Sequence, residues 1–395
     1  MQNHPTAVIV GAARTPIGAY RGSLASLSAP QLGAIAIKAA LERAGLKPED
    51  VQDVIMGCVL QGGIGQAPAR QAAIAAGIPT SAGAWTVNKV CSSGLKAVML
   101  AAAQIESGEY DVVVAGGMES MSNTPHYVYW ARGGVGYGHA QVTDGIIKDG
   151  LWDVYGDKHM GNCAESCARE HNITREMQDE FAKQSYTRAL DAQKAGRFDA
   201  EIVPVSLPQK KGDPIIVRED EEPKKAKLDK FAELRPAFDK AGTITAANAS
   251  SLNDSAAAVV LVSSTFAKAR GLKPLAKITG WATHSQEPEW FTTAPAEAVA
   301  KLLKKLNWTT DKVDLFELNE AFSVVALYNN RKLGLPADKV NIWGGAVALG
   351  HPIGASGTRI LVTLLHALLA NGGKRGIAGL CNGGGEATAL AVELL

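Results

Sequence analysis

The sequence has few features that would place the protein outside a reducing compartment or against a charged partner. Its five cysteines are an odd number scattered over 395 residues, which argues against a disulfide framework and favours a reducing compartment. The formal net charge is only +1, so the charge balance does not call for nucleic acid or an anionic membrane. We therefore expect neither as a partner.

Targeting and membrane signals are also scarce. The first residues carry no basic stretch followed by a signal-type apolar run, and the first arginine, Arg14, falls inside the first predicted strand and loop, so a transit peptide is not expected. No apolar run looks long enough to span a bilayer, since Val112–Gly117 and Val259–Val262 are short. The final residues are not a peroxisomal Ser-Lys-Leu address. We expect a soluble, cytoplasmic protein.

Apolar residues and glycine are what the sequence holds in quantity. Hydrophobic residues make up 46% of the chain and charged residues 20%, so it can bury a sizeable core. Its length exceeds that of one ordinary domain. The 41 glycines show no short-period repeat, and this composition fits a loop-rich α/β enzyme.

Two parts of the chain repeat the same order of predicted elements. A strand-like run at Asp53–Gly57 precedes a helical run near Ser93, and a strand-like run at Asp314–Glu317 precedes a helical run near Ser356. The intervals, 53 to 93 and 314 to 356, are 40 and 42 residues. Identity between the two parts is thin and chance is the alternative, but the matched order favours a duplication. Alternating strands and helices predict mostly parallel sheets covered by helices.

The texture changes between the two parts. Met121–Gly161 is rich in Gly, Tyr, His and Trp without a clean period, and Arg218–Lys230 is a mixed-charge stretch with little apolar content. Residues from about 122 to 250 therefore look like a large insertion. Loops this long in a compact protein usually carry function.

Two cysteines stand in segments suited to covalent chemistry. Cys91 lies where a strand-like run gives way to a helical pattern, and Ser92-Ser93-Gly94 follows it. Backbone N–H groups and the helix dipole at such a corner favour a thiolate and an adjacent oxyanion. Cys381 precedes Asn382 and three glycines, where the backbone can come close to a ligand. A lone cysteine is as often a small buried hydrophobe, but this setting favours a nucleophile.

A histidine and an asparagine are further candidates. His351 lies in the glycine-rich loop Gly350–Gly357, and an imidazole on such a loop is suited to deprotonating a thiol, with a structural histidine as the alternative. Asn319 follows a predicted strand. It is either a helix N-cap or an amide that holds a water or a substrate oxygen.

Two other patterns are set aside. Histidine and cysteine recur every four residues from 159 to 171, but on one helix they form a stripe about 18 Å long that cannot surround a tetrahedral ion. We therefore expect helix packing and no metal. The segment after Gly11 lacks the second and third glycines of a dinucleotide-binding fingerprint. We therefore do not expect NAD binding.

Four motifs taken together resemble those of the thiolase family. They are Asn-Lys-Val-Cys-Ser-Ser-Gly at 88–94, Asn-Glu-Ala-Phe at 319–322, Gly-His-Pro-Ile-Gly at 350–354 and Cys-Asn-Gly-Gly-Gly at 381–385. The resemblance runs the length of the chain and is closest to the acetyl-CoA acetyltransferases of that family.

The resemblance implies an α/β fold of two duplicated αβαβα core domains with an inserted loop domain. The first core domain would comprise residues 1–121 and 251–275, and the second residues 276–395. The inserted domain, residues 122–250, would bind CoA and mediate tetramerisation.

Carried over residue by residue, the resemblance implies a role for each motif. Cys91 would take up the acyl group after activation by His351. His351 and a water on Asn319 would form the oxyanion hole for the enolate of a second acetyl-CoA. The N–H groups of Cys91 and Gly383 would form the other hole, and Cys381 would move the proton of the α-carbon. Two acetyl-CoA would give acetoacetyl-CoA and CoA, and thiolysis is the reverse.

The resemblance also implies that CoA thioesters are substrates and that no cofactor is permanently bound. Where relatives carry an arginine near the adenine this chain has Pro223-Lys224-Lys225, and where they carry a serine it has Lys230. These lysines either meet the CoA phosphates or form a solvated face. The expected CoA-lining residues are Leu151, His159, Met160, Phe238, Ala246, Ala249, Ser250 and Leu252.

Chain length and assembly also follow from the resemblance. Trp290–Phe291 occupies the segment that closes the acyl pocket in relatives, which predicts a short acyl substrate. The aromatic-rich segment Thr124–Ala140 matches the tetramerisation loop and predicts a homotetramer.

Three other functions are alternatives, and the residues present argue against the last two. A broader-range 3-ketoacyl-CoA thiolase of fatty-acid β-oxidation would share all four motifs. A ketoacyl synthase would carry a histidine in place of Asn319 and lack Cys381, and a non-catalytic lipid-binding relative would have lost Cys91 or His351.

Overall fold

The computed structural model describes residues 5–395. A ten-stranded sheet runs through the molecule in the order β14-β15-β16-β13-β1-β12-β5-β3-β4, with β2 paired to β12. Its strands are β1 (Ala7–Arg14), β2 (Gly18–Ala19), β3 (Asp53–Gly57), β4 (Gly83–Val87), β5 (Val112–Ser120), β12 (Asn253–Ser263), β13 (Ala276–Ser285), β14 (Leu315–Leu318), β15 (Arg375–Asn382) and β16 (Glu386–Leu394).

The sheet divides into two parts that meet at a narrow seam. Strands β1 and β13 are joined by only two residue pairs, Val8 with Lys277 and Ile9 with Ala276. On either side of the seam the pairing is much longer, and β12 pairs with β5 over nine positions. Each part of the sheet therefore belongs to one half of the chain.

The prediction of mostly parallel sheets is wrong. Among the described strands of the large sheet, parallel pairing is confined to β3 with β4, β3 with β5, and β14 with β15. The other ladders are antiparallel. One reason is that β15 and β16 are separated by three residues, which forms a hairpin and forces antiparallel pairing. Another is that β12, which follows the inserted segment, lies between β1 and β5 and runs antiparallel to both.

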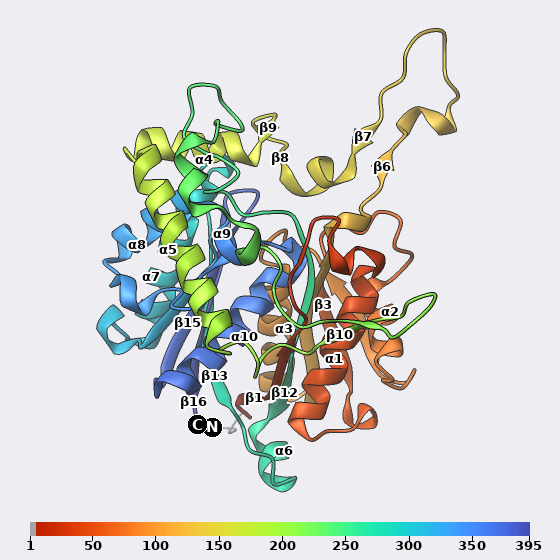
Figure 1. Ribbon diagram of the computed structural model, residues 1–395. Helices are drawn as coiled ribbons and strands as arrows, with labels where there is room; N and C mark the ends of the chain where they lie inside the picture. The colour runs from red at the N-terminus through yellow and green to blue at the C-terminus, as the bar shows by residue number, and fades with distance from the viewer. Residues whose placement is uncertain (1–4) are drawn as a thin grey trace.

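Helices form three layers with the two parts of the sheet between them (Figure 1). Helices α1 and α2 pack on the outer face of the first part, and α7 packs on the outer face of the second with α8 beside it. Helices α3 and α10 pack on each other and on strands of both parts. The bounds are α1 (Ala29–Ala44), α2 (Pro68–Ala75), α3 (Ser93–Ser107), α6 (Ser264–Ala269), α7 (Ala294–Leu306), α8 (Ser323–Leu333), α9 (Ala346–Leu349) and α10 (Ile353–Asn371).

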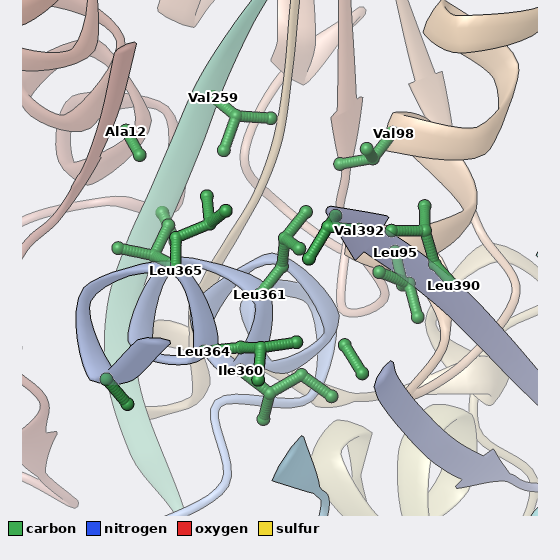
Figure 2. Packing of buried hydrophobic residues seen from close by; sticks show 14 of the residues in the cluster. Ala12, Leu95, Val98, Val259, Ile360, Leu361, Leu364, Leu365, Leu390 and Val392 are labelled. Atoms are coloured by element: carbon green, nitrogen blue, oxygen red, sulfur yellow. The ribbon is translucent and has the colours of Figure 1, made fainter. Parts of the chain in front are cut away.

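Helix α10 lies at the centre of the core. By length and composition it could cross a membrane, so the expectation that no apolar stretch is long enough is wrong, but most of the helix is buried inside the protein. A helix that is apolar on all sides suits a position between two sheets. Figure 2 shows its side chains Ile360, Leu361, Leu364 and Leu365 among Ala12, Leu95, Val98, Val259, Leu390 and Val392.

The segment 122–250, which the structure describes throughout, contributes no strand to the large sheet. Between β6 and β7 the chain extends far from the body of the molecule (Figure 1). The elements of this segment are β6 (His126–Tyr127), β7 (Thr143–Asp144), β8 (Trp152–Asp153), β9 (Lys158–His159), α4 (Met160–Glu170), α5 (Arg175–Lys194), β10 (Val205–Leu207) and β11 (Ile215–Val217).

The histidine and cysteine stripe lies along α4. Cys163 and Cys167 are fully buried in an apolar cluster with Phe291 and Val324, and His159 is the N-cap, whose Nδ1 accepts from the Gly161 N–H at 3.0 Å. Among residues 5–395, no three His, Cys, Asp or Glu side chains gather as a metal site. The stripe serves helix packing.

Candidate active site

One cavity of about 530 Å³ brings together segments from both halves and from the insertion. Cys91, His351 and Gly383 line it. Asn319 and Cys381 are almost fully buried and are not among the described residues that line the cavity. All eight residues expected to line the CoA path lie on its wall: Leu151, His159, Met160, Phe238, Ala246, Ala249, Ser250 and Leu252.

A strained turn presents Cys91. β4 ends at Val87 and α3 begins at Ser93, and between them Val90 has φ of +46°. A β-branched residue rarely adopts this left-handed conformation, so surrounding contacts must hold it. The Ser93 hydroxyl supplies them, since it donates to the Val90 carbonyl at 2.6 Å and accepts from the Lys89 N–H at 2.8 Å.

The Cys91 thiol is protonated at rest. Burial raises its pKa to about 12, and the nearby carboxylate of Glu119 adds to the rise. Hydrogen bonds from the backbone N–H groups of Gly383 and of Cys91 itself oppose it. The backbone donors favour the thiolate, as predicted, but desolvation outweighs them in the free protein. Cys91 needs a base at the moment of reaction.

His351 is arranged as a neutral base. Its Nδ1 lies 2.6 Å from the Ser356 hydroxyl, which donates its own proton to the Pro352 carbonyl at 3.0 Å. On this pattern we assign the ring proton to Nδ1, which donates to Ser356 and leaves Nε2 as the basic nitrogen. Burial, with the nearby Arg359 charge, lowers the pKa of His351 to about 3. The ring is uncharged at neutral pH.

Asn319 lies beside the His351 ring and is not a helix cap. Helix α8 begins at Ser323 with Phe322 as its N-cap, so the capping alternative is excluded. The Asn319 amide nitrogen is 3.4 Å from Nε2 and 3.5 Å from Nδ1 of His351. Its Oδ1 is buried and has no hydrogen-bond partner among the described residues. A buried carbonyl oxygen of this kind is suited to accept from a water.

Cys381 lies on β15 behind the cavity wall. It is fully buried in the cluster that also contains Met160 and Phe322. Burial raises its pKa well above the ordinary value, and a negative charge on Cys91 would raise it further. The two thiols are therefore close enough for the charge of one to oppose ionisation of the other.

Two side-chain contacts tie the Cys91 turn to the Gly383 turn. The Thr388 hydroxyl of β16 donates to the Ser92 hydroxyl at 3.1 Å in the interior. Nearer the surface, Lys89 forms an ion pair with Glu386. The Cys91 and Gly383 N–H groups come from different halves of the chain, so these contacts fix their spacing.

The aromatic pair Trp290–Phe291 divides between two environments. Phe291 is 3% exposed and lines the cavity. Trp290 is not among the described lining residues, and its ring lies 6.3 Å from that of His171. Phe291 is thus the member of the pair that can limit the acyl group.

The lysines near position 224 are engaged elsewhere. Lys224 pairs with Glu219, and Lys230 pairs with Glu233 at 3.0 Å, all at exposed positions. Neither lysine is among the described residues that line the cavity. Their contacts are those of a solvated charged face.

The cavity wall also includes residues that the sequence did not single out. Phe322 and Ile353 lie inside two of the four motifs, so the motifs themselves were a signal. Tyr20 and Ile146 line the cavity from segments without a motif. They come close only through the fold.

A thiol, a neutral imidazole and two backbone N–H groups around one cavity define an enzyme that transfers acyl groups through its own cysteine. The family model "Thiolase, N-terminal domain" matches residues 7–265, and "Thiolase, C-terminal domain" matches residues 272–394. The chain belongs to the thiolase family, as its four motifs predict.

Relatives of known name match over nearly the full length. An acetyl-CoA acetyltransferase of Cupriavidus necator is 56% identical and covers 98% of both chains. Acetyl-CoA acetyltransferase 2 of Arabidopsis thaliana is also 56% identical, over 98% of this chain and 96% of its own. The crystal structure of Acat5 thiolase from Ascaris suum in complex with coenzyme A superposes with a TM-score of 0.94 at 45% identity, covering 99% of this chain and 100% of that one. The predicted thiolase fold is confirmed.

Proposed function

We propose that the protein is an acetyl-CoA C-acetyltransferase, which joins two acetyl-CoA into acetoacetyl-CoA and CoA and catalyses the reverse thiolysis. The observation that carries the proposal is the single cavity in which Cys91, His351 and Gly383 lie with all eight expected CoA-path residues. The names of the relatives support the acetyl substrate over the broader β-oxidation alternative.

In the first half-reaction, Nε2 of His351 takes the proton of Cys91, and the sulfur attacks the thioester carbonyl of acetyl-CoA. The N–H groups of Cys91 and Gly383 stabilise the oxyanion that forms. The C–S bond to CoA then breaks, and His351 returns its proton to the CoA sulfur. The products are acetyl-Cys91 and free CoA.

In the second half-reaction, Nε2 of His351 takes the proton of Cys381, and the resulting thiolate removes a proton from the α-carbon of a second acetyl-CoA. The enolate oxygen is stabilised by the proton now on Nε2 of His351 and by a water on Asn319. The α-carbon attacks acetyl-Cys91, the bond to sulfur breaks, and the Cys91 thiolate takes the proton from His351. Both thiols are protonated at the start and at the end of the full cycle, in keeping with the raised pKa of each.

CoA would bind along the cavity as a substrate and not as a resident cofactor. His159 and Phe238 stack with ring centroids 4.7 Å apart and form one aromatic wall of this path. We also propose a reducing, cytoplasmic setting, which is supported by the reaction's need for two free thiols; all five cysteines are free.

A homotetramer is supported by the projecting segment between β6 and β7. Tyr129 is 65% exposed, Trp130 is 39% exposed and Tyr137 is fully exposed. Aromatic side chains on a projecting loop are costly in water and are typical of an interface. We propose that this segment, within residues 124–140, joins copies of the chain.

Thiolysis across acyl chain lengths tests the proposed activity. Purified protein is expected to cleave acetoacetyl-CoA with CoA much faster than 3-ketodecanoyl-CoA. Equal efficiency with both would select the broader β-oxidation thiolase instead. No cleavage of either, with Cys91 intact, would reject a thiolase activity.

A further inference from the structure

The loop that carries His351 is held at two points by buried side chains from other parts of the chain. The backbone N–H of His351 donates to Oδ1 of Asn253 at 2.9 Å. Three residues later, the N–H of Gly354 donates to Oε2 of Glu119 at 2.8 Å. Asn253 and Glu119 are both fully buried. They lie on neighbouring strands, β12 and β5.

The two glycines of Gly-His-Pro-Ile-Gly make room for these contacts. A Cβ at position 350 would lie 2.2 Å from Oδ1 of Asn253, and one at position 354 would lie 2.6 Å from Oε2 of Glu119. Gly350 also has φ of +104°, which side chains disfavour. Each glycine of the motif therefore admits one anchoring side chain, on either side of His351.

Glu119 holds a second segment of the cavity wall at the same time. Its Oε2 also accepts from the Val59 N–H at 3.1 Å, and its Oε1 accepts from the Leu60 N–H at 3.1 Å. Val59 and Leu60 belong to the small apolar cluster that includes Ile353 and packs against Cys91. One carboxylate thus fixes the wall beside the thiol and the loop that carries the base.

Asn253 is equally well anchored. Its Nδ2 donates to the Gly18 carbonyl at 3.0 Å, and its Oδ1 also accepts from the Ser251 hydroxyl at 2.9 Å. The amide therefore cannot rotate without breaking several contacts. The Asn253 side chain therefore holds the His351 backbone at a fixed position relative to the sheet.

We propose that Asn253 and Glu119 are positioning residues for His351, which hold its backbone so that Nε2 faces the Cys91 thiol. The proposal rests on the acyl-transfer function proposed above. Both residues would act by positioning His351 and would not contact the substrate. Displacement of a reacting group by about 1 Å can reduce a rate about 100-fold, so weakening either anchor has a large effect on chemistry.

The test uses Glu119→Gln, Asn253→Ala and Asn253→Asp in the full-length protein. Asp53→Asn is the matched control, because Asp53 is a buried carboxylate that accepts from the Trp85 and Gln104 side chains at the far end of β3. We expect Glu119→Gln and Asn253→Ala to lower kcat of thiolysis about tenfold to a hundredfold, with KM for CoA within about twofold. Asn253→Asp should recover activity, since a protonated aspartate can accept from His351 and donate to the Gly18 carbonyl.

A second readout does not depend on the substrate. Iodoacetamide alkylation of Cys91, followed by peptide mapping over a range of pH, reports removal of the thiol proton by His351. It should slow in Asn253→Ala and not in Asp53→Asn; Glu119→Gln is left out of this readout, because loss of the Glu119 charge by itself lowers the pKa of Cys91. Unchanged kcat in the folded variants, with unchanged alkylation in Asn253→Ala, would overturn the proposal, as would equal losses in the control. If no thioester is turned over but Asn253→Ala still slows alkylation, the positioning role stands and the proposed function fails.

Discussion

Nδ1 of His351 and the hydroxyl of Ser356 lie 2.6 Å apart, and this contact selects the tautomer of the base. We assign the hydroxyl proton to the Pro352 carbonyl, in which case the imidazole donates to Ser356. Without the serine oxygen, the proton can move to Nε2 and the ring can no longer accept the Cys91 proton.

Ser356→Ala is accordingly expected to lower kcat about tenfold to a hundredfold, since an unpaired buried donor costs about 1–3 kcal/mol and 1.4 kcal/mol corresponds to a tenfold rate change. Steady-state thiolysis measures this. The control is Ser323→Ala, because the Ser323 hydroxyl is buried without a partner among the described residues. Equal activity of the two variants would contradict the tautomer assignment.

The two thiols should fail in different ways. Cys91→Ala removes the acyl carrier, so no acetyl group should transfer from radiolabelled acetyl-CoA to the protein. Cys381→Ala should still be labelled at Cys91 but should form no acetoacetyl-CoA, because only condensation needs α-carbon deprotonation. Labelling followed by peptide mapping distinguishes the two. Loss of labelling in both variants would remove the role given to Cys381.

Stability should fall as Glu119 ionises. Burial raises the pKa of Glu119 to about 7, although the Leu60, Val59 and Gly354 N–H groups oppose the rise. A carboxyl with a raised folded-state pKa favours the folded state most below its unfolded pKa, near 4.3, and this contribution is lost as pH rises to about 7. The free energy of unfolding should therefore decrease relative to Glu119→Gln by about 3 kcal/mol over this range.

Urea unfolding at several pH values measures this difference. Burial, together with the charge of Glu119, raises the pKa of the Cys58 and Cys91 thiols, so they stay neutral in this range. A constant difference between the two proteins from pH 4.5 to 7 would show that Glu119 does not titrate there.

Phe291 should set the acyl chain length and Trp290 should not. Phe291→Leu removes aromatic bulk from the cavity wall and is expected to raise kcat/KM for 3-ketohexanoyl-CoA relative to acetoacetyl-CoA about tenfold, since one methylene is worth about 1–3 kcal/mol in a pocket. Trp290→Leu, outside the described lining, is the matched control. A shift of similar size in the control would mean that chain length is limited elsewhere.

The exposed aromatics should govern assembly. Replacing Tyr129, Trp130 and Tyr137 by serine removes apolar surface from the projecting segment and should convert tetramers into dimers by light scattering. Tyr155→Ser is the control, because Tyr155 is 73% exposed on a different turn. A tetramer that survives the triple change would place the interface elsewhere.

The sequence predicted those parts of the site that depend on the local conformation of the backbone. The motifs around Cys91, His351 and Gly383 predict tight loops, and in the structure these three residues line one cavity. Local patterns do not encode the burial of a side chain, so the desolvation that outweighs the backbone donors at Cys91 could not be predicted. The antiparallel pairing of most strands was not predicted for a similar reason. β12 follows the insertion, and the sequence does not show that it pairs with β1 and β5.

The anchors of His351 were also beyond reach of the sequence. Glu119 contacts Gly354 across 235 residues of chain, and a glutamate on an apolar strand has no local pattern that assigns it a partner. The glycines at 350 and 354 indicate only that another group lies close to the backbone. The structure shows that these groups are the side chains of Asn253 and Glu119.

The contact of α3 with α10 at the centre of the molecule bears on ancestry. These two helices occupy corresponding places in the two halves, and each follows a loop that carries one partner of the reaction, Cys91 before α3 and His351 before α10. If the two halves arose by duplication, as their repeated order of elements predicts, a half-length ancestor that paired with its own copy would have buried this helix against its counterpart. After fusion the two matching loops would no longer have to be identical, and one could specialise as the carrier of the acyl group and the other as its proton acceptor.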